Sequence, residues 1–411
     1  MVAAALAVLA VMVYQIPAVN DRLGWRVEYA LIYARSVVDP IQAMPTAAPA
    51  AETSVAQVTD APTRTPTQPA TPTPVAATGT PEPSPTPTFT ATPVPDKVIL
   101  PAPRNEKEDL NACGPATLAM YLRFYGWEGD QFTISKEIKP IRADRNVNIE
   151  ELYSYVLKNT LNLRVQYRVG GSIDYLREFI ANGVPVMIEE SFKLDKAFRI
   201  NDDLWAGHYV LLTGYNDAMK VFTVQDSERG PNRVVTYEQV EKDWQSFNHV
   251  YMFIYPVEKE PDIQAMLGSD WNADQNRQNA LDAAKKETET NPKNGYAWFN
   301  LGTNLVYFER YTEAVQAYDK AREAGLPQRM LRYQFGPFIA YFHSGRTEDL
   351  LTLTDYALEV TDNSEEAQLW RGWGLYRQGK RAEAVESFQK ALEDRPGYPD
   401  ALYALDYVSK N

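Results

Sequence analysis

A lone cysteine and the residues around it are the best candidates for nucleophilic chemistry. Cys113 is the only cysteine in 411 residues, so the chain forms no intramolecular disulfide and no multi-thiolate metal site. It precedes an apolar, periodic stretch whose first turn would hold Pro115, which predicts a helix over 115–125 with the thiol at its N-terminus. There the helix dipole and free N–H groups favour a thiolate and can stabilise an oxyanion. Gly114 would let a substrate carbonyl approach.

A nucleophilic thiol needs a base, and the chain has three histidines. His343 falls in the helical C-terminal region, where a surface position is expected. His249 stands beside the last expected strand, where packing or capping is the simpler role. His208, just before an expected strand over 209–215, is the candidate base.

An expected hairpin places a carboxylate opposite this histidine. Strands over 209–215 and 220–225 flank a turn at Asn216-Asp217, so opposed residues should have numbers that sum to about 434 or 435. His208 and Asp226 meet this condition, and directly opposed residues share one face of a sheet within about 5.5 Å. The carboxylate could therefore orient one imidazole nitrogen while the other faces the thiol, as in a catalytic triad.

Three short segments resemble papain-superfamily cysteine peptidases related to bacteriocin-processing, double-glycine-leader peptidases. Cys-Gly-Pro-Ala at 113–116, Gly-His-Tyr-Val at 207–210 and Val-Gln-Asp-Ser at 224–227 occur in the family's order. The resemblance implies an α+β papain-like domain over 97–257, in which a buried strand is expected over 183–191. It also implies peptide-bond hydrolysis through a thioester acyl-enzyme, with no metal or organic cofactor.

One departure from the family affects the oxyanion site. Relatives commonly carry a Gln a few residues before the nucleophile as an oxyanion donor, whereas this chain has Lys107 and Glu108. An ionised Glu cannot donate a hydrogen bond. The amide of Asn111 or backbone N–H groups would then serve, or the activity is weak. Trp205, close to His208, would either shield the imidazole from water or pack in the core.

The N-terminal part has the composition of an anchor and a spacer. Residues 2–17 are apolar, which predicts a signal anchor or transmembrane helix over 1–20, followed by a juxtamembrane helix over 21–43. Residues 44–96 are rich in Pro and Thr, which predicts a disordered spacer. We therefore expect a single-pass membrane protein whose folded domains are extracytoplasmic, or a secreted protein if the N-terminus is cleaved.

The C-terminal third contains an internal repeat. After an expected linker over 258–275, Gly302 and Tyr318 match Gly372 and Phe388 across 70 residues, which is two units of the tetratricopeptide period. Residues 276–411 resemble tetratricopeptide repeats, which implies an all-α solenoid that binds a substrate or partner protein. The alternative is that the repeats pack only on the peptidase-like domain.

The charge of the chain argues against one class of partner, and the site residues leave three functional hypotheses. The net charge of −13 with no basic cluster excludes a nucleic-acid-binding surface. The leading hypothesis is a membrane-anchored cysteine peptidase whose repeats position a protein substrate. A catalytically silent papain-like protein that binds peptides or acts as a scaffold is the second, motivated by Lys107 and Glu108. The third is amidase or acyl-transferase chemistry with the same three residues.

Overall fold

The computed structural model describes most of the chain from residue 94 onward and three short N-terminal pieces. The described residues are 30–31, 33–38, 40–47, 94–141, 144, 146–197, 199–361 and 363–410. The anchor expected over 1–20 and most of the spacer expected over 44–96 lie outside them. Within these ranges, no helix combines the length and the apolar character needed to cross a membrane.

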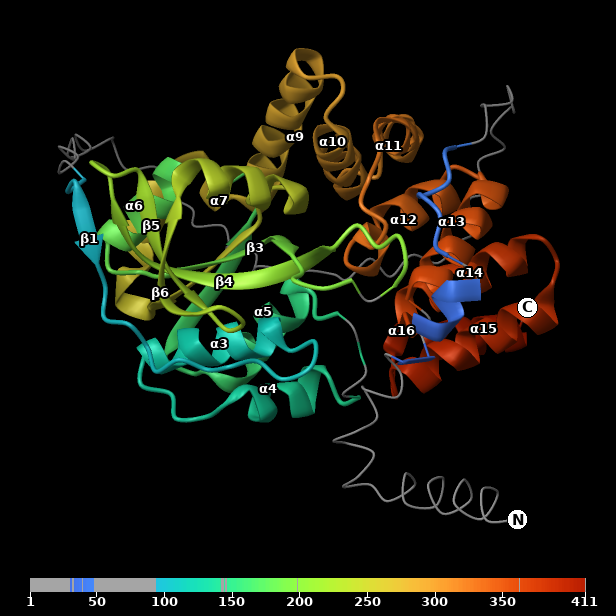
Figure 1. Ribbon diagram of the computed structural model, residues 1–411, viewed down its shortest axis with the longest axis horizontal. Coiled ribbons are helices and arrows are strands. Elements are labelled where there is room, and N and C mark those ends of the chain that lie inside the picture. The colour runs from blue at the N-terminus through green and yellow to red at the C-terminus, as the bar shows by residue number, and fades with distance from the viewer. Residues whose placement is uncertain are drawn as a thin grey trace, which may run out of the picture.

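The first domain is a mixed α/β unit built on one antiparallel sheet (Figure 1). The strands are hydrogen-bonded in the order β2-β7-β3-β4-β5-β6, and β1 pairs with the far part of β4. Its elements are β1 (Lys97–Ile99), α3 (Cys113–Phe124), α4 (Gln131–Ile138), α5 (Ile149–Asn159), β2 (Leu163–Arg168), α6 (Ile173–Ala181), β3 (Val186–Lys193), β4 (Trp205–Asn216), β5 (Val221–Asp226), β6 (Gly230–Thr236), α7 (Tyr237–Trp244), η1 (Gln245–Phe247) and β7 (Tyr251–Pro256).

Helices cover both faces of this sheet. Helices α3, α4 and α5 pack on the face that carries Met187 and Leu211, whereas α6 and α7 pack on the face that carries Ile188 and Val210. Successive residues of a strand point to opposite faces, so β3 and the middle of β4 are apolar on both sides. The predicted helix after the cysteine is α3, which begins at Cys113 itself rather than at Pro115.

The β4–β5 hairpin has a different register from the expected one. Val210 lies opposite Asp226, and a β-bulge follows between Leu212 and Gly214. The prediction that His208 lies directly opposite Asp226 is therefore wrong. The turn lies one residue further along the chain than expected, so that paired residues next to it have numbers summing to 437, and the bulge lowers this sum to 436. The partner of Asp226 is thus shifted by two residues, from His208 to Val210. Two residues is the period of side-chain alternation, so His208 and Asp226 still project from the same face.

Helices make up the rest of the chain. They are η2 (Val257–Lys259), α8 (Glu260–Leu267), η3 (Gly268–Trp271), α9 (Ala273–Thr290), α10 (Gly295–Tyr307), α11 (Tyr311–Ala324), η4 (Met330–Arg332), α12 (Gly336–His343), α13 (Thr347–Val360), α14 (Glu365–Arg377), α15 (Arg381–Asp394) and α16 (Pro399–Lys410). A Cβ atom on Gly302 would lie 2.7 Å from the ring of Tyr318, and one on Gly372 would lie 2.4 Å from the ring of Phe388. The predicted pairing of a glycine with an aromatic ring therefore brings the two helices of each unit into close contact.

The residues expected as a linker over 258–275 are folded. They form η2, α8, η3 and the start of α9. Ile263 and Leu267, four residues apart on one face of α8, are buried in the core of the first domain. The polar composition of this stretch predicted a linker, whereas two apolar residues one helical turn apart are enough to form a short amphipathic helix.

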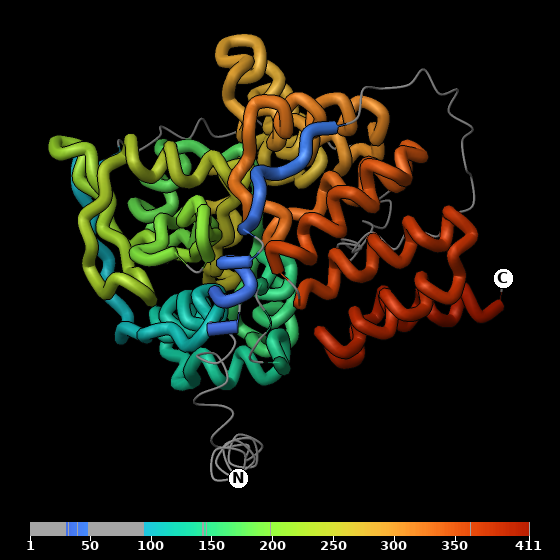
Figure 2. Tube along the Cα trace, turned by 45° about the vertical axis from the view of Figure 1, so that its right-hand side comes forward, coloured from blue at the N-terminus to red at the C-terminus, as the bar shows by residue number. Residues whose placement is uncertain are grey.

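An N-terminal segment, residues 40–47, packs on the repeats, so the first residues of the expected spacer are ordered. Ile41 and Met44 are buried in the core of the repeat domain. The hydroxyl of Tyr356 donates to the carbonyl of Gln42 at 3.0 Å. Figure 2 shows this segment in blue, between the first domain and the repeats.

The repeats dock directly on the first domain. The amide of Asn248 donates to Asn304 at 2.8 Å, and that of Asn300 donates to the carbonyl of Gln245 at 2.8 Å. These contacts join η1 and its C-terminal flank to α10. The two domains therefore share polar contacts. This interface lies close to the start of β4, where His208 is found.

Candidate active site

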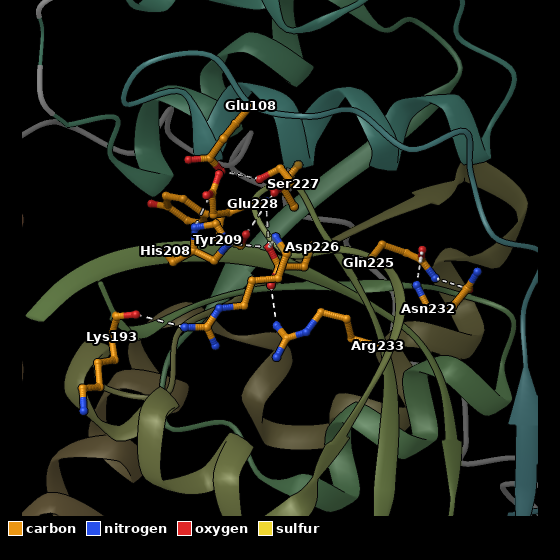
Figure 3. A network of polar contacts seen from close by, with 12 residues as sticks. Glu108, Lys193, His208, Tyr209, Gln225, Asp226, Ser227, Glu228, Asn232 and Arg233 are labelled. Carbon is orange, nitrogen blue, oxygen red and sulfur yellow. Dashed lines mark hydrogen bonds and ion pairs between the residues drawn. The ribbon is translucent and has the colours of Figure 1, made fainter. Parts of the chain in front are cut away.

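His208 and Asp226 form a buried pair at the end of the β4–β5 hairpin (Figure 3). Nε2 of His208 lies 3.0 Å from Oδ1 of Asp226. The backbone N–H groups of Glu228 and Arg229 donate to the same Oδ1, at 2.8 and 2.9 Å, and Arg233 donates to Oδ2. Because every donor around the carboxylate favours its charged form, Asp226 is held as an anion that orients the imidazole.

Cys113 is brought to the other side of the imidazole by the start of α3. It is half-buried, lines the same cleft as His208 and is close enough to raise the pKa of that imidazole. Since Nε2 faces Asp226, Nδ1 is the nitrogen left for the thiol. The three residues expected to act together are therefore brought to one cleft, although the hairpin register differs from the expected one.

The charges of this group stabilise one another. Burial opposes a charged imidazole, yet the hydrogen bond that His208 donates to Asp226 and the interaction with Cys113 raise the pKa of His208 well above its ordinary value. For Asp226, burial acts to raise the pKa, but the bond to His208 and the two backbone donors leave it lowered. An imidazolium beside a helix N-terminus is the setting in which a thiol is ionised and reactive.

Lys107 and Glu108 lie in different places. The ammonium group of Lys107 points away from the imidazole and pairs with Glu228 at the rim. The carboxylate of Glu108 accepts from Ser227 Oγ at 2.6 Å and lies 3.8 Å from His208 Nδ1. Burial raises the pKa of Glu108. Glu108, not Lys107, therefore faces the reacting groups.

Asn111 and Gly114 flank Cys113 and line the same cleft. Asn111 has a left-handed backbone with φ 52°, a conformation that Asn tolerates better than most residues. A Cβ atom on Gly114 would point at Leu152 and Tyr209, with contacts of 3.4 Å to each. These are ordinary van der Waals distances, so packing does not require a glycine here, and the approach of a substrate carbonyl to Gly114 stays a prediction.

Trp205 does not cover the imidazole. It stacks on Phe247, with ring centroids 5.8 Å apart, and meets the edge of Tyr333 from the repeat region. The ring beside His208 belongs to Phe192, at a centroid distance of 4.7 Å. Of the two roles considered for Trp205, the structure therefore supports packing, at the interface between the domains.

Phe192 and Glu190 come from the strand beside His208, and the sequence did not predict that either lies next to the imidazole. Glu190 lies opposite His208 in the β3–β4 register, and burial raises its pKa to about 8. Its neighbour Glu189 is also buried and accepts a hydrogen bond from Tyr209 at 2.9 Å. Only the pairing of β3 with β4 could have revealed these residues, because nothing in the local sequence sets that register.

The cleft around Cys113 has a volume of about 910 Å³ and is lined by both domains. The β3–β4 loop contributes Lys196, and the repeat region contributes Arg329, Arg332 and Tyr333. Across the described residues, no group of three or more His, Cys, Asp or Glu side chains is placed to hold a metal ion. The arrangement suits acyl transfer through a thiolate, for which the chain itself supplies nucleophile and base.

Comparisons with known proteins match each of the two domains to a different family. Residues 99–252 match the Peptidase_C39 like family, and residues 365–398 match the tetratricopeptide repeat. No curated protein matches the chain.

Solved structures are similar to one part of the chain or the other. A C39-like peptidase from Bacillus anthracis is 19% identical over 39% of this chain and 97% of its own, with a TM-score of 0.31. The peptidase domain of Streptococcus ComA is 16% identical over 38% and 99%, with a TM-score of 0.29. The repeat protein YrrB is 23% identical over 36% and 74%, with a TM-score of 0.30. The two family matches confirm the resemblance found in the sequence: residues 99–252 are similar to C39-like peptidases, and residues 365–398 are similar to a tetratricopeptide repeat.

Proposed function

We propose that the chain is a cysteine peptidase in which Cys113 is the nucleophile, His208 the general base and acid, and Asp226 the residue that orients the imidazole. The observation that carries this proposal is the position of His208 between its two partners: Nε2 lies 3.0 Å from Asp226, and the imidazole lines the same cleft as Cys113. The thiol is also the only one in the chain.

The reaction follows from these positions. The thiolate of Cys113 attacks the scissile carbonyl carbon, and the oxyanion that forms is stabilised by donors at the start of α3. The imidazolium of His208 gives its proton to the leaving amine as the C–N bond breaks, which leaves a thioester. Neutral His208 then deprotonates a water molecule that hydrolyses the thioester and restores the thiol.

Loss of either reacting side chain tests the proposal. The full chain and its Cys113→Ala and His208→Ala variants are incubated with a proteome-derived peptide library, and the new termini are counted by mass spectrometry. Cleavage should disappear in both variants and persist in the control His343→Ala, whose side chain lies in the repeats. Hydrolysis that survives in Cys113→Ala would exclude this cysteine as the nucleophile.

A catalytically silent peptide-binding protein is the second candidate, favoured by the carboxylate of Glu108 in the cleft. An ionised carboxylate cannot donate to an oxyanion and repels it. In this case Cys113→Ala would bind library peptides as tightly as the unchanged chain, and neither protein would cleave them. A cleavage profile combined with a pull-down separates the two candidates.

The repeats and the N-terminal part suggest where and on what the peptidase acts. Tetratricopeptide repeats commonly bind peptides or proteins, and here they form one wall of the cleft, so we propose that they position a protein substrate. The apolar stretch at 2–17 and the Pro/Thr-rich stretch support attachment to a membrane with the folded domains on the extracytoplasmic side. Protease treatment of intact cells, followed by detection of residues 97–411, tests this placement.

A further inference from the structure

The repeat region reaches the cleft through a hydrogen bond to the residue two positions before Cys113. Nη2 of Arg332, the last residue of η4, donates to Oδ1 of Asn111 at 3.1 Å. The two residues are 221 positions apart in the sequence. Both side chains line the cleft that contains Cys113. A residue of the repeat domain therefore contacts the segment that leads into the nucleophile.

This contact fixes which way the Asn111 carboxamide points. A guanidinium only donates hydrogen bonds, so the atom that faces Arg332 must be the amide oxygen and not the nitrogen. The Nδ2 of Asn111 is buried, and it finds no hydrogen-bond partner in the described part of the chain. A buried N–H group without a partner destabilises a fold, so such groups are rare and are often explained by a function.

We propose that Arg332 is a positioning residue that holds the carboxamide of Asn111 so that its NH₂ group donates to the oxyanion formed on Cys113. The inference rests on the proposed function and adds a role for the repeat domain in it. Asn111 supplies the neutral donor that Glu108, when ionised, cannot supply. Because the donor is oriented from the second domain, correct docking of the repeats is a condition for turnover.

Two other hydrogen bonds from the segment around Arg332 cross the domain interface, and neither involves Asn111. Arg329 donates to the carbonyl of Trp205 at 2.7 Å, and Gln334 donates to that of Ser246 at 2.8 Å. These bonds join the domains at backbone atoms and leave Asn111 untouched. Gln334 is therefore a matched control, since its loss removes one interface bond without freeing the carboxamide.

Removal of the donor should affect turnover rather than substrate binding. Asn111→Gly keeps the left-handed backbone without strain, and Asn111→Asp keeps the size and the bond from Arg332 but presents only acceptors. Each should lower kcat for peptide hydrolysis by about 10²–10³, the usual effect of losing one oxyanion donor, with little change in KM.

Arg332 should act only through Asn111. Arg332→Ala should lower kcat by about tenfold, because the carboxamide is then free to turn, and Arg332→Lys should recover part of this loss because an ammonium group also donates. In the Asn111→Gly background, Arg332→Ala should have no further effect. Gln334→Ala should stay within about twofold of the unchanged chain. An equal loss from Arg332→Ala in both backgrounds would show that Arg332 acts independently, and the proposal would be wrong.

Alkylation separates this inference from the proposed function. Iodoacetamide reacts with a thiolate by direct displacement and forms no oxyanion, and Cys113 is the only thiol that it can label. The alkylation rate should be unchanged in Asn111→Gly and Arg332→Ala. Slow alkylation of the unchanged chain would refute the Cys113 mechanism itself. Fast alkylation together with full hydrolysis by Asn111→Gly would refute only the role of Asn111 and Arg332.

Discussion

Replacement of Glu108 by Gln should increase peptidase activity at neutral pH. The Glu108 carboxylate lies 3.8 Å from Nδ1 of His208. At this distance and an effective dielectric constant of about 20, one unit charge interacts with another by roughly 4 kcal/mol. The carboxylate attracts the imidazolium and repels an oxyanion in the same cleft, so these two effects largely offset each other during the reaction.

The amide of the Glu108→Gln variant then adds a donor at little electrostatic cost. Removal of an oxyanion donor in other enzymes costs about 10²–10³ in turnover. Since the pocket is shaped for a carboxylate, we expect about a tenfold gain in kcat/KM at pH 8. The imidazolium should persist, because Glu108 contributes less to the raised pKa of His208 than Asp226 and Cys113 do.

The gain should depend on pH in a defined direction. Burial raises the pKa of Glu108, and a protonated carboxyl donates a hydrogen bond much as an amide does. The ratio of kcat/KM for Glu108→Gln to that of the unchanged chain should therefore approach one at acid pH and grow as the pH rises through the raised pKa. An internally quenched peptide measures this from pH 4 to 9, with Glu228→Gln as the control at the exposed rim. A ratio that is constant with pH, or below one throughout, would refute this account of Glu108.

Three further predictions concern the imidazole, the N-terminal segment and the domain interface. Asp226→Asn should lower turnover by up to about 10⁴-fold, as the equivalent change does in a Ser-His-Asp triad, and full activity would contradict its orienting role. Ile41→Ala with Met44→Ala should lower the free energy of unfolding of the repeats by about 2–4 kcal/mol in urea titrations, whereas Gln42→Asp with Ala43→Asp, at exposed positions, should not. Burial raises the pKa of Glu365 to about 8, so its contribution to stability is fully present below pH 4.5 and is lost as the pH rises through 8. The melting temperature of Glu365→Gln should accordingly fall less between pH 5 and 8.5 than that of the exposed control Glu383→Gln. An equal fall in both variants would contradict this.

Local patterns in the sequence were enough to predict which residues lie together in the cleft. The setting of Cys113 before a helix depends on the few residues that follow it, and α3 is found there. The choice of His208 and Asp226 survived an incorrect register, because the shift matched the two-residue period of a strand. The expected proximity of His208 and Asp226 is confirmed, but for a weaker reason than direct opposition, since a shift of one residue would have separated the two side chains.

The rest of the cleft depends on contacts between segments far apart in the sequence. Phe192 reaches His208 through the β3–β4 pairing, and Arg332 reaches Asn111 through the docking of a second domain. Sequence spacing contains no information on either distance. The burial of Met44 and the folding of 258–275 were missed for a related reason, because a few apolar residues in a polar or proline-rich stretch are stabilised only by the partner surface.

The most direct test of the account is the rate at which iodoacetamide alkylates Cys113 at pH 6, measured by intact mass in the full chain and in His208→Ala. A thiolate paired with the imidazolium of His208 should react at least about tenfold faster than free cysteine, and the advantage should vanish in the variant. A rate equal to that of free cysteine in the unchanged chain, or an unaltered fast rate in His208→Ala, would contradict the claim that these two side chains form a nucleophilic pair.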